Sequence, residues 1–158
     1  MARNDAPRVL EMRRNPEPGI VGSMNDLAEL GPQVDAVVVS LDGAQRAVRL
    51  LVDTGADVTM VSEGVLADLR SVPEGMSLVE GVFAGPAERE VHDLTLRLML
   101  TDGDTVVVQA FVTSMPTAND GVDGLVGREI LELLRMTYDG PTGVFELLRP
   151  ARSRPQGA

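Results

Sequence analysis

The feature that most constrains this chain is a series of short apolar runs, separated by turns that contain glycine and aspartate. Between residues 94 and 100, leucines alternate with other side chains, which is the period of a β-strand with one buried face. Asp42-Gly43 separates two apolar runs, and this dipeptide favours a tight hairpin turn. Residues 101–104 form a similar turn before another apolar run at 106–112. Many short strands with little helix predict an all-β fold, either a closed barrel or a sandwich.

A few segments carry other local signals. Ser62 is a favourable N-cap for a short helix at residues 63–69. From Glu129 onward the apolar residues recur at helical spacing, so a second short helix is expected in the C-terminal half. The apolar runs on either side of Asp139-Gly140 predict a last hairpin that ends at residue 148.

The composition excludes several kinds of chemistry. The chain has 158 residues, which suits one domain, and no cysteine, so it has neither disulfides nor a thiolate metal site. All its basic residues are arginine, which removes Schiff-base chemistry and the lysine of a phosphate-binding loop. A Ser-His nucleophile pair would depend on the single histidine, His92. The net charge of −10 argues against nucleic acid or an anionic membrane as a partner.

The chain divides into three parts by composition. Residues 1–32 are rich in Pro, Gly, Asn and Arg and predict a flexible N-terminal arm. Residues 33–149 carry the alternating pattern and predict the folded domain, and residues 150–158 predict a disordered tail. The first 31 residues contain no apolar run long enough for a signal peptide or a membrane span, so a cytoplasmic location is expected.

Two motifs carry the candidate chemistry. An apolar run ends in residues 53–57, Asp-Thr-Gly-Ala-Asp, where the glycine permits a sharp turn. Residues 125–129, Leu-Val-Gly-Arg-Glu, join an apolar strand to the second helix, and a hairpin is expected around residues 81–86 between the motifs. In this order they resemble the active-site loop, flap and second motif of the retroviral-type, or retropepsin-like, aspartic proteases. The resemblance covers residues 34–148 and is greatest to the bacterial relatives that add a C-terminal hairpin.

The resemblance implies an all-β, closed-barrel acid protease fold of a single lobe, with one short helix in the C-terminal half and a flap hairpin. It also implies a role for each site residue. Asp53 would be the catalytic carboxylate, Thr54 would bond across a dimer axis, and the Gly55 carbonyl would accept a substrate N–H. Asp57 would form a structural ion pair with Arg128. The implied substrate-binding residues are Ala56, Asp57, Val58 and Val126 and, in the flap, Val82, Phe83, Ala84 and Gly85.

Hydrolysis of a peptide by two carboxyl groups needs one ionised group to activate water and one protonated group to polarise the carbonyl. Two like charges about 3 Å apart cannot both ionise, and aspartic proteases are the familiar example of such a shared proton. One chain has a single Asp-Thr-Gly sequence, so the second carboxyl group must come from a second copy in a homodimer. We expect an aspartic endopeptidase that cuts extended peptides or proteins between apolar residues, without a metal or cofactor. Ala56 replaces a serine common in two-lobed relatives, so a less acidic working pH is expected.

Other interpretations fit parts of this pattern. A catalytically silent pepsin-like module that only dimerises or binds peptides would have the same motifs, and it stays open. A phosphate-binding loop of the actin and sugar-kinase type needs two lobes and a longer chain. His92 is expected to be partly exposed on the flap strand, without a role. Asp102 and Asp104 are expected to form a turn, since a calcium loop needs more oxygen ligands.

Overall fold

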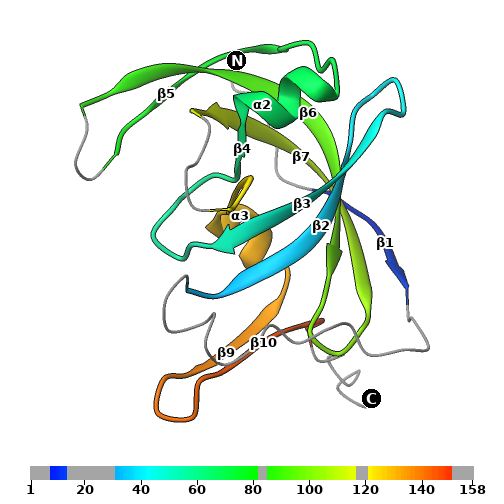
Figure 1. The fold of residues 1–158 in the computed structure, drawn as a ribbon, viewed down its shortest axis with the longest axis vertical. Coiled ribbons are helices and arrows are strands. Elements are labelled where there is room, and N and C mark those ends of the chain that lie inside the picture. Colours follow the sequence, from blue (N-terminus) through cyan, green and yellow to red (C-terminus); the bar gives the residue numbers. More distant parts are fainter. Residues whose placement is uncertain (1–7, 14–30, 82–84, 117–120, 151–158) are drawn as a thin grey trace, which may run out of the picture.

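A computed structural model describes residues 8–13, 31–81, 85–116 and 121–150 (Figure 1). Six strands wrap into a closed barrel, in the order β7-β4-β8-β3-β2-β6, which β6 closes by pairing with β7. The barrel strands are β2 (Gln33–Val39), β3 (Gln45–Val52), β4 (Met60–Ser62), β6 (Ala87–Met99), β7 (Thr105–Met115) and β8 (Gly124–Val126). The all-β closed barrel predicted from the sequence is confirmed.

The long strands β6 and β7 form the back of the barrel. They pair antiparallel from Val91 opposite Thr113 to Met99 opposite Thr105. Along β6 the alternating leucines Leu94, Leu96 and Leu98 have no exposed surface. A fully buried leucine stabilises the fold by about 1.5–3 kcal/mol relative to an exposed one. The period-two pattern in the sequence therefore marks the wall that encloses the core.

The predicted hairpin around Asp42-Gly43 is β2 paired with β3, from Gln33 opposite Leu51 to Val39 opposite Gln45. Both predicted helices are present and short. α2 (Glu63–Asp68) begins after Ser62, whose hydroxyl accepts a hydrogen bond from the Val65 backbone N–H, as expected of an N-cap. α3 (Arg128–Leu131) follows β8 directly and buries Ile130 and Leu131 in the core.

Two strands extend the sheet beyond the barrel. β5 (Gly75–Val79) pairs with the first half of β6, and this hairpin projects from the barrel on the same side as the β3–β4 loop (Figure 1). β1 (Arg8–Arg13) pairs antiparallel with β7. β1 was not predicted from the sequence, because the Pro, Gly and Asn around it favoured an arm and its pairing partner lies about a hundred residues further on. The other residues assigned to the arm, and those of the tail from residue 151, lie outside the described residues.

The predicted C-terminal hairpin consists of β9 (Arg135–Asp139) and β10 (Val144–Leu148), which form a separate two-stranded sheet at the far end from α2 (Figure 1). The turn between β6 and β7 holds this hairpin in place. The Thr101 hydroxyl accepts from the Leu147 N–H at 2.9 Å, and the Thr101 N–H donates to the Leu147 carbonyl at 3.0 Å. Leu147 is fully buried, and an ion pair between Arg149 and the buried Asp104 lies beside it.

No helix among the residues that the structure describes is long and apolar enough to cross a membrane.

Candidate active site

The barrel brings the two sequence motifs together. β3 and β8 are parallel neighbours, with Val52 opposite Val126, so the chain leaves both strands at the same edge of the sheet. The Asp53 N–H donates to the Val126 carbonyl at 3.1 Å, which continues this pairing by one residue. Asp53 therefore begins its loop directly beside the second motif, although 74 positions separate Asp53 from Gly127.

Asp53 lies at the entrance of a tight loop. One of its side-chain oxygens, Oδ1, accepts the Gly55 N–H at 2.8 Å, and its backbone carbonyl accepts the Ala56 N–H at 3.3 Å. Asp53 is half-buried, whereas Thr54 and Gly55 are exposed. The carboxyl group is thus oriented by its own loop while the residues next to it remain open to a partner or a ligand.

Arg128, the first residue of α3, ties the second motif to this loop. Its backbone N–H donates to the Ala56 carbonyl at 2.9 Å, and its guanidinium donates to the Thr54 carbonyl at 3.3 Å. The guanidinium also forms an ion pair with Asp57, although both side chains are more than half exposed. The Asp57–Arg128 contact implied by the resemblance is therefore present, in an exposed position where its net stabilisation is small.

Thr59 and Glu129 form a second link, which lies deeper. The Thr59 hydroxyl accepts the Gly127 N–H at 3.0 Å, and the Thr59 N–H donates to Glu129 Oε1. Thr59 is fully buried and Glu129 is mostly buried. Neither Thr59 nor the Glu129 side chain was assigned a role from the sequence. The signal that could have found this link is the pairing of a threonine after the first motif with a carboxyl group at the end of the second motif.

Gly127 is the point of closest approach between the two motifs. A Cβ placed on Gly127 would lie 2.4 Å from the Val58 carbonyl carbon and 2.6 Å from the Val58 oxygen. Gly127 has φ −88° and ψ 176°, an extended conformation open to any residue, so space alone requires the glycine. The glycine of the second motif therefore lets two backbone segments touch.

The remaining predicted site residues are distributed unevenly. Val58 is exposed beside the loop, as a pocket-lining residue must be. Val126 instead has no exposed surface, since its side chain points into the barrel core, so the expectation that it lines a pocket is not met. Gly85 is exposed near the end of the β5–β6 hairpin. Val82, Phe83 and Ala84, which were predicted from the sequence to belong to a flap, lie outside the described residues.

The expectation that His92 is partly exposed is wrong. Its side chain is 1% exposed, and its Nδ1 lies 2.9 Å from the Ser71 hydroxyl, just beyond α2. The reason is tertiary, because α2 packs over the base of the β5–β6 hairpin. Within the described parts of the chain, no three His, Asp or Glu residues are grouped closely enough to hold a metal ion.

Residues 33–138 match the family model described as retroviral aspartyl protease. This match spans more than half of the chain, so the chain belongs to that family. Two solved structures are similar at low scores. EIAV protease complexed with the inhibitor HBY-793 is 18% identical, over 66% of this chain and 89% of that chain, with a TM-score of 0.36. The retroviral protease-like domain of Ddi1 from Leishmania major is 13% identical, over 75% of this chain and 94% of that chain, with a TM-score of 0.41. No curated protein sequence matches this chain.

Proposed function

We propose that this chain is an aspartic endopeptidase that works as a homodimer, in which Asp53 of each subunit contributes one of two carboxyl groups that share a proton. The observation that carries this proposal is the position of Asp53 at the start of an exposed loop. Arg128 and Glu129, which belong to the second motif, are hydrogen-bonded to this loop and to the residues that follow it. A carboxyl group held in this way can take a proton from water and later return it to the leaving amine.

The homodimer is part of the proposal because one subunit supplies a single carboxyl group of the required kind. Thr54, Gly55 and Val58 are exposed around Asp53, which leaves the loop accessible to the same loop of a second copy. In a twofold dimer each loop meets its own copy, so the two Asp53 carboxyl groups approach each other on the axis.

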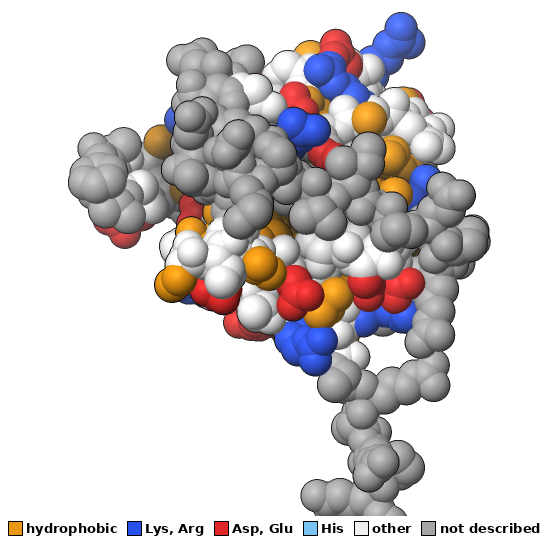
Figure 2. Space-filling view, turned by 60° about the horizontal axis from the view of Figure 1, so that its bottom comes forward, with side chains coloured by type: hydrophobic (Ala, Val, Ile, Leu, Met, Phe, Trp, Pro, Cys, Tyr) orange, Lys and Arg blue, Asp and Glu red, His pale blue; other side chains and the backbone are white. Residues whose placement is uncertain are grey.

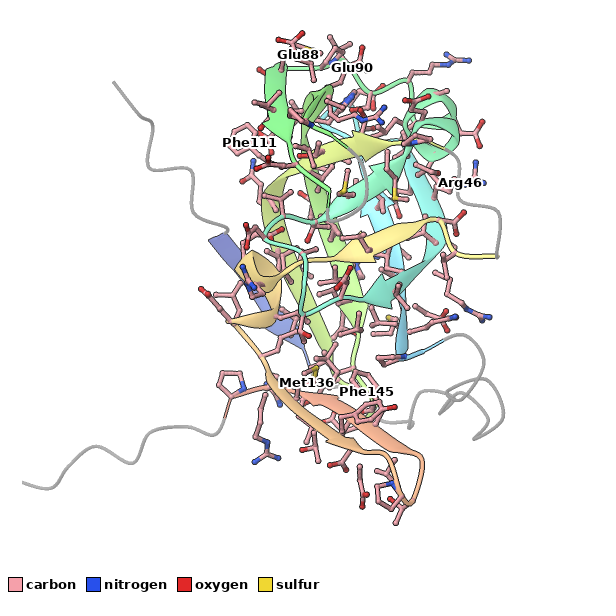
Figure 3. The ribbon with its side chains drawn as sticks, turned by 90° about the vertical axis from the view of Figure 1, so that its left-hand side faces the viewer. Arg46, Glu88, Glu90, Phe111, Met136 and Phe145 are labelled. Carbon is pink, nitrogen blue, oxygen red and sulfur yellow. The ribbon has the colours of Figure 1, made fainter. Side chains whose placement is uncertain are left out.

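The β9–β10 hairpin offers a second surface for that dimer. Met136, Tyr138, Phe145 and Leu147 share one face of it, since Tyr138 pairs with Phe145 and Met136 with Leu147. The β10 residues of this face pack against the core, while Met136 and Tyr138 remain 38% and 57% exposed. Figure 3 labels Met136 and Phe145 on the hairpin, which lies at the end of the molecule far from α2. Figure 2 shows hydrophobic side chains among charged ones at that end. A second copy would cover this apolar face.

The proposed substrate is an extended peptide. β5 lies at the edge of its sheet and, among the described strands, pairs only with β6, so its outer edge can hydrogen-bond an added strand. Val58, near Asp53, is exposed and suits apolar substrate side chains. Closure of the β5–β6 hairpin over the peptide would exclude water from the reacting bond. Activity is expected to increase as the pH falls to mildly acidic values, because the acidic subunits then repel each other less.

The test is cleavage of an unbiased peptide mixture, read by mass spectrometry, with wild-type protein and Asp53→Asn between about pH 4 and pH 7. Cuts between apolar residues that the substitution abolishes would support the proposal. If a protein verified as a dimer makes no cuts, the protease assignment fails and the silent dimerisation or peptide-binding module takes its place.

A further inference from the structure

Glu129 is the last residue of the second motif, and its carboxyl group contacts the chain just after the first motif. Oε1 accepts the Thr59 N–H, so it holds the chain where it leaves the Asp53 loop. The other oxygen, Oε2, is buried and has no hydrogen-bond partner among the described residues. A buried polar atom without a partner is costly, and an ionised carboxylate in this position would be more costly still.

The surroundings of Oε2 suggest how the cost is avoided. The position that a Cβ of Gly127 would occupy is 2.6 Å from Oε2 and 2.6 Å from the Val58 carbonyl oxygen. The carboxyl oxygen and the carbonyl oxygen thus border the same small space, which the glycine leaves open. Both oxygens are acceptors and cannot hydrogen-bond each other, whereas a proton on Oε2 would offer the Val58 carbonyl a donor across this space.

We propose that Glu129 acts as a neutral carboxylic acid that positions the active-site loop, accepting from the Thr59 N–H through Oε1 and donating to the Val58 carbonyl through Oε2. Glu129 is a positioning residue in this account, since it acts on Asp53 only through the loop that carries it. Loss of the proton would replace the donor by a buried negative charge, loosen the loop and set an upper pH limit on activity. The effect on activity rests on the proposed protease function.

The electrostatics agree with a neutral group. Burial raises the pKa of Glu129, the hydrogen bonds from Thr59 act in the opposite direction with a smaller effect, and the charge of Glu132 raises it further. The other charged groups around the two motifs are Asp53, Asp57 and Arg128, the last two paired with each other at the surface. Since the folded-state pKa lies above the unfolded one, the folded protein is favoured at low pH, and this contribution is lost as the pH rises through the folded-state pKa.

Glu129→Gln tests the proposal directly, because an amide accepts through its oxygen, donates through its nitrogen and cannot ionise. Glu129→Ala removes both contacts, and Glu132→Gln removes one exposed negative charge from the end of the same helix as a control. Each protein is assayed for kcat and KM on a peptide substrate from about pH 4 to pH 8. Unfolding by urea is followed over the same range, independently of activity.

For Glu129→Gln we expect near wild-type kcat at acidic pH and a ratio of kcat at about pH 7 to kcat at about pH 5 that is roughly threefold to tenfold higher than in wild type. Glu129→Ala should lower kcat more than it changes KM. Glu132→Gln should keep the shape of the wild-type pH profile with at most a slight shift to lower pH, because the Glu132 charge is the smallest of the influences on the Glu129 pKa. Stability should fall with rising pH in wild type more steeply than in Glu129→Gln.

Three results would overturn the proposal. They are a Glu129→Gln pH profile that superimposes on wild type, a Glu129→Gln variant as impaired as Glu129→Ala, and equal pH dependence of unfolding in wild type and Glu129→Gln. If no protein has activity, the proposed function fails, and the unfolding measurements alone decide whether Glu129 is neutral.

Discussion

Replacement of Gly127 by alanine probes the close contact between the two motifs. The added Cβ would lie 2.4 Å from the Val58 carbonyl carbon and 2.6 Å from Glu129 Oε2. Real Cβ atoms do not approach backbone atoms this closely, so either the Val58 segment or the start of α3 must shift. Because the extended conformation of Gly127 suits alanine, no backbone strain contributes to the result.

The expected change in the free energy of unfolding follows from two opposing effects. Overpacking a site of this kind costs about 1–3 kcal/mol, while a Gly→Ala change restricts the unfolded chain and returns about 0.4–1 kcal/mol. The obstructing atoms are mostly backbone and cannot rotate away, so we expect a net loss of about 2 kcal/mol in the free energy of unfolding. In a chain of this size such a loss lowers Tm by about 4–8 °C.

The assay is urea unfolding at one fixed protein concentration, because a dimer makes apparent stability depend on concentration. Gly75→Ala is the matched control, since a Cβ on Gly75 meets no atom within 4 Å. Gly75→Ala should change stability by less than about 1 kcal/mol. If Gly127→Ala is as stable as wild type and keeps full peptidase activity, the claim that the two motifs depend on this contact is wrong.

Three further substitutions test other contacts by urea unfolding. Asp57→Asn removes the exposed ion pair with Arg128 and should cost less than about 1 kcal/mol, so a larger loss would show that the pair is structurally more important than its exposure suggests. Arg70 has a left-handed φ of 50° where the chain leaves α2, and Arg70→Gly should stabilise the protein by about 1 kcal/mol; destabilisation would contradict this view. Arg149→Met leaves the buried Asp104 without its partner and should cost about 3 kcal/mol, and a cost below about 1 kcal/mol would mean that the pair does not anchor the C-terminal hairpin.

Local signals account for the parts of the fold that the sequence predicted well. The Asp42-Gly43 turn, the alternating leucines of β6 and the Ser62 cap each depend on neighbours within a few residues, and each is present in the structure. The two motifs were recognisable because turn and packing requirements restrict their residue types. Strand ends were less predictable, and β7 extends to Thr105 and Met115 because both of its edges are paired.

The features that the sequence did not predict depend on contacts between distant segments. The Thr59–Glu129 hydrogen bond joins residues 70 positions apart, and only the places of the two residues relative to the two motifs connect them. The alternation of apolar and polar residues does not decide whether the His92 side chain faces the core or the solvent, and the packing of α2 buries it. The β1 strand exists because it pairs with β7, and the residues of β1 taken alone predicted part of a flexible arm.

The central claim is that one active site requires Asp53 from two subunits. The most direct test mixes wild-type protein with increasing amounts of Asp53→Asn at a constant wild-type concentration, under conditions that allow subunits to exchange. The homodimer account predicts that an equal amount of the variant lowers peptidase activity to about half, and that an excess lowers it further, as wild-type subunits enter mixed dimers. Activity that stays constant as the variant is added would show that each subunit cleaves peptides on its own and would contradict the account.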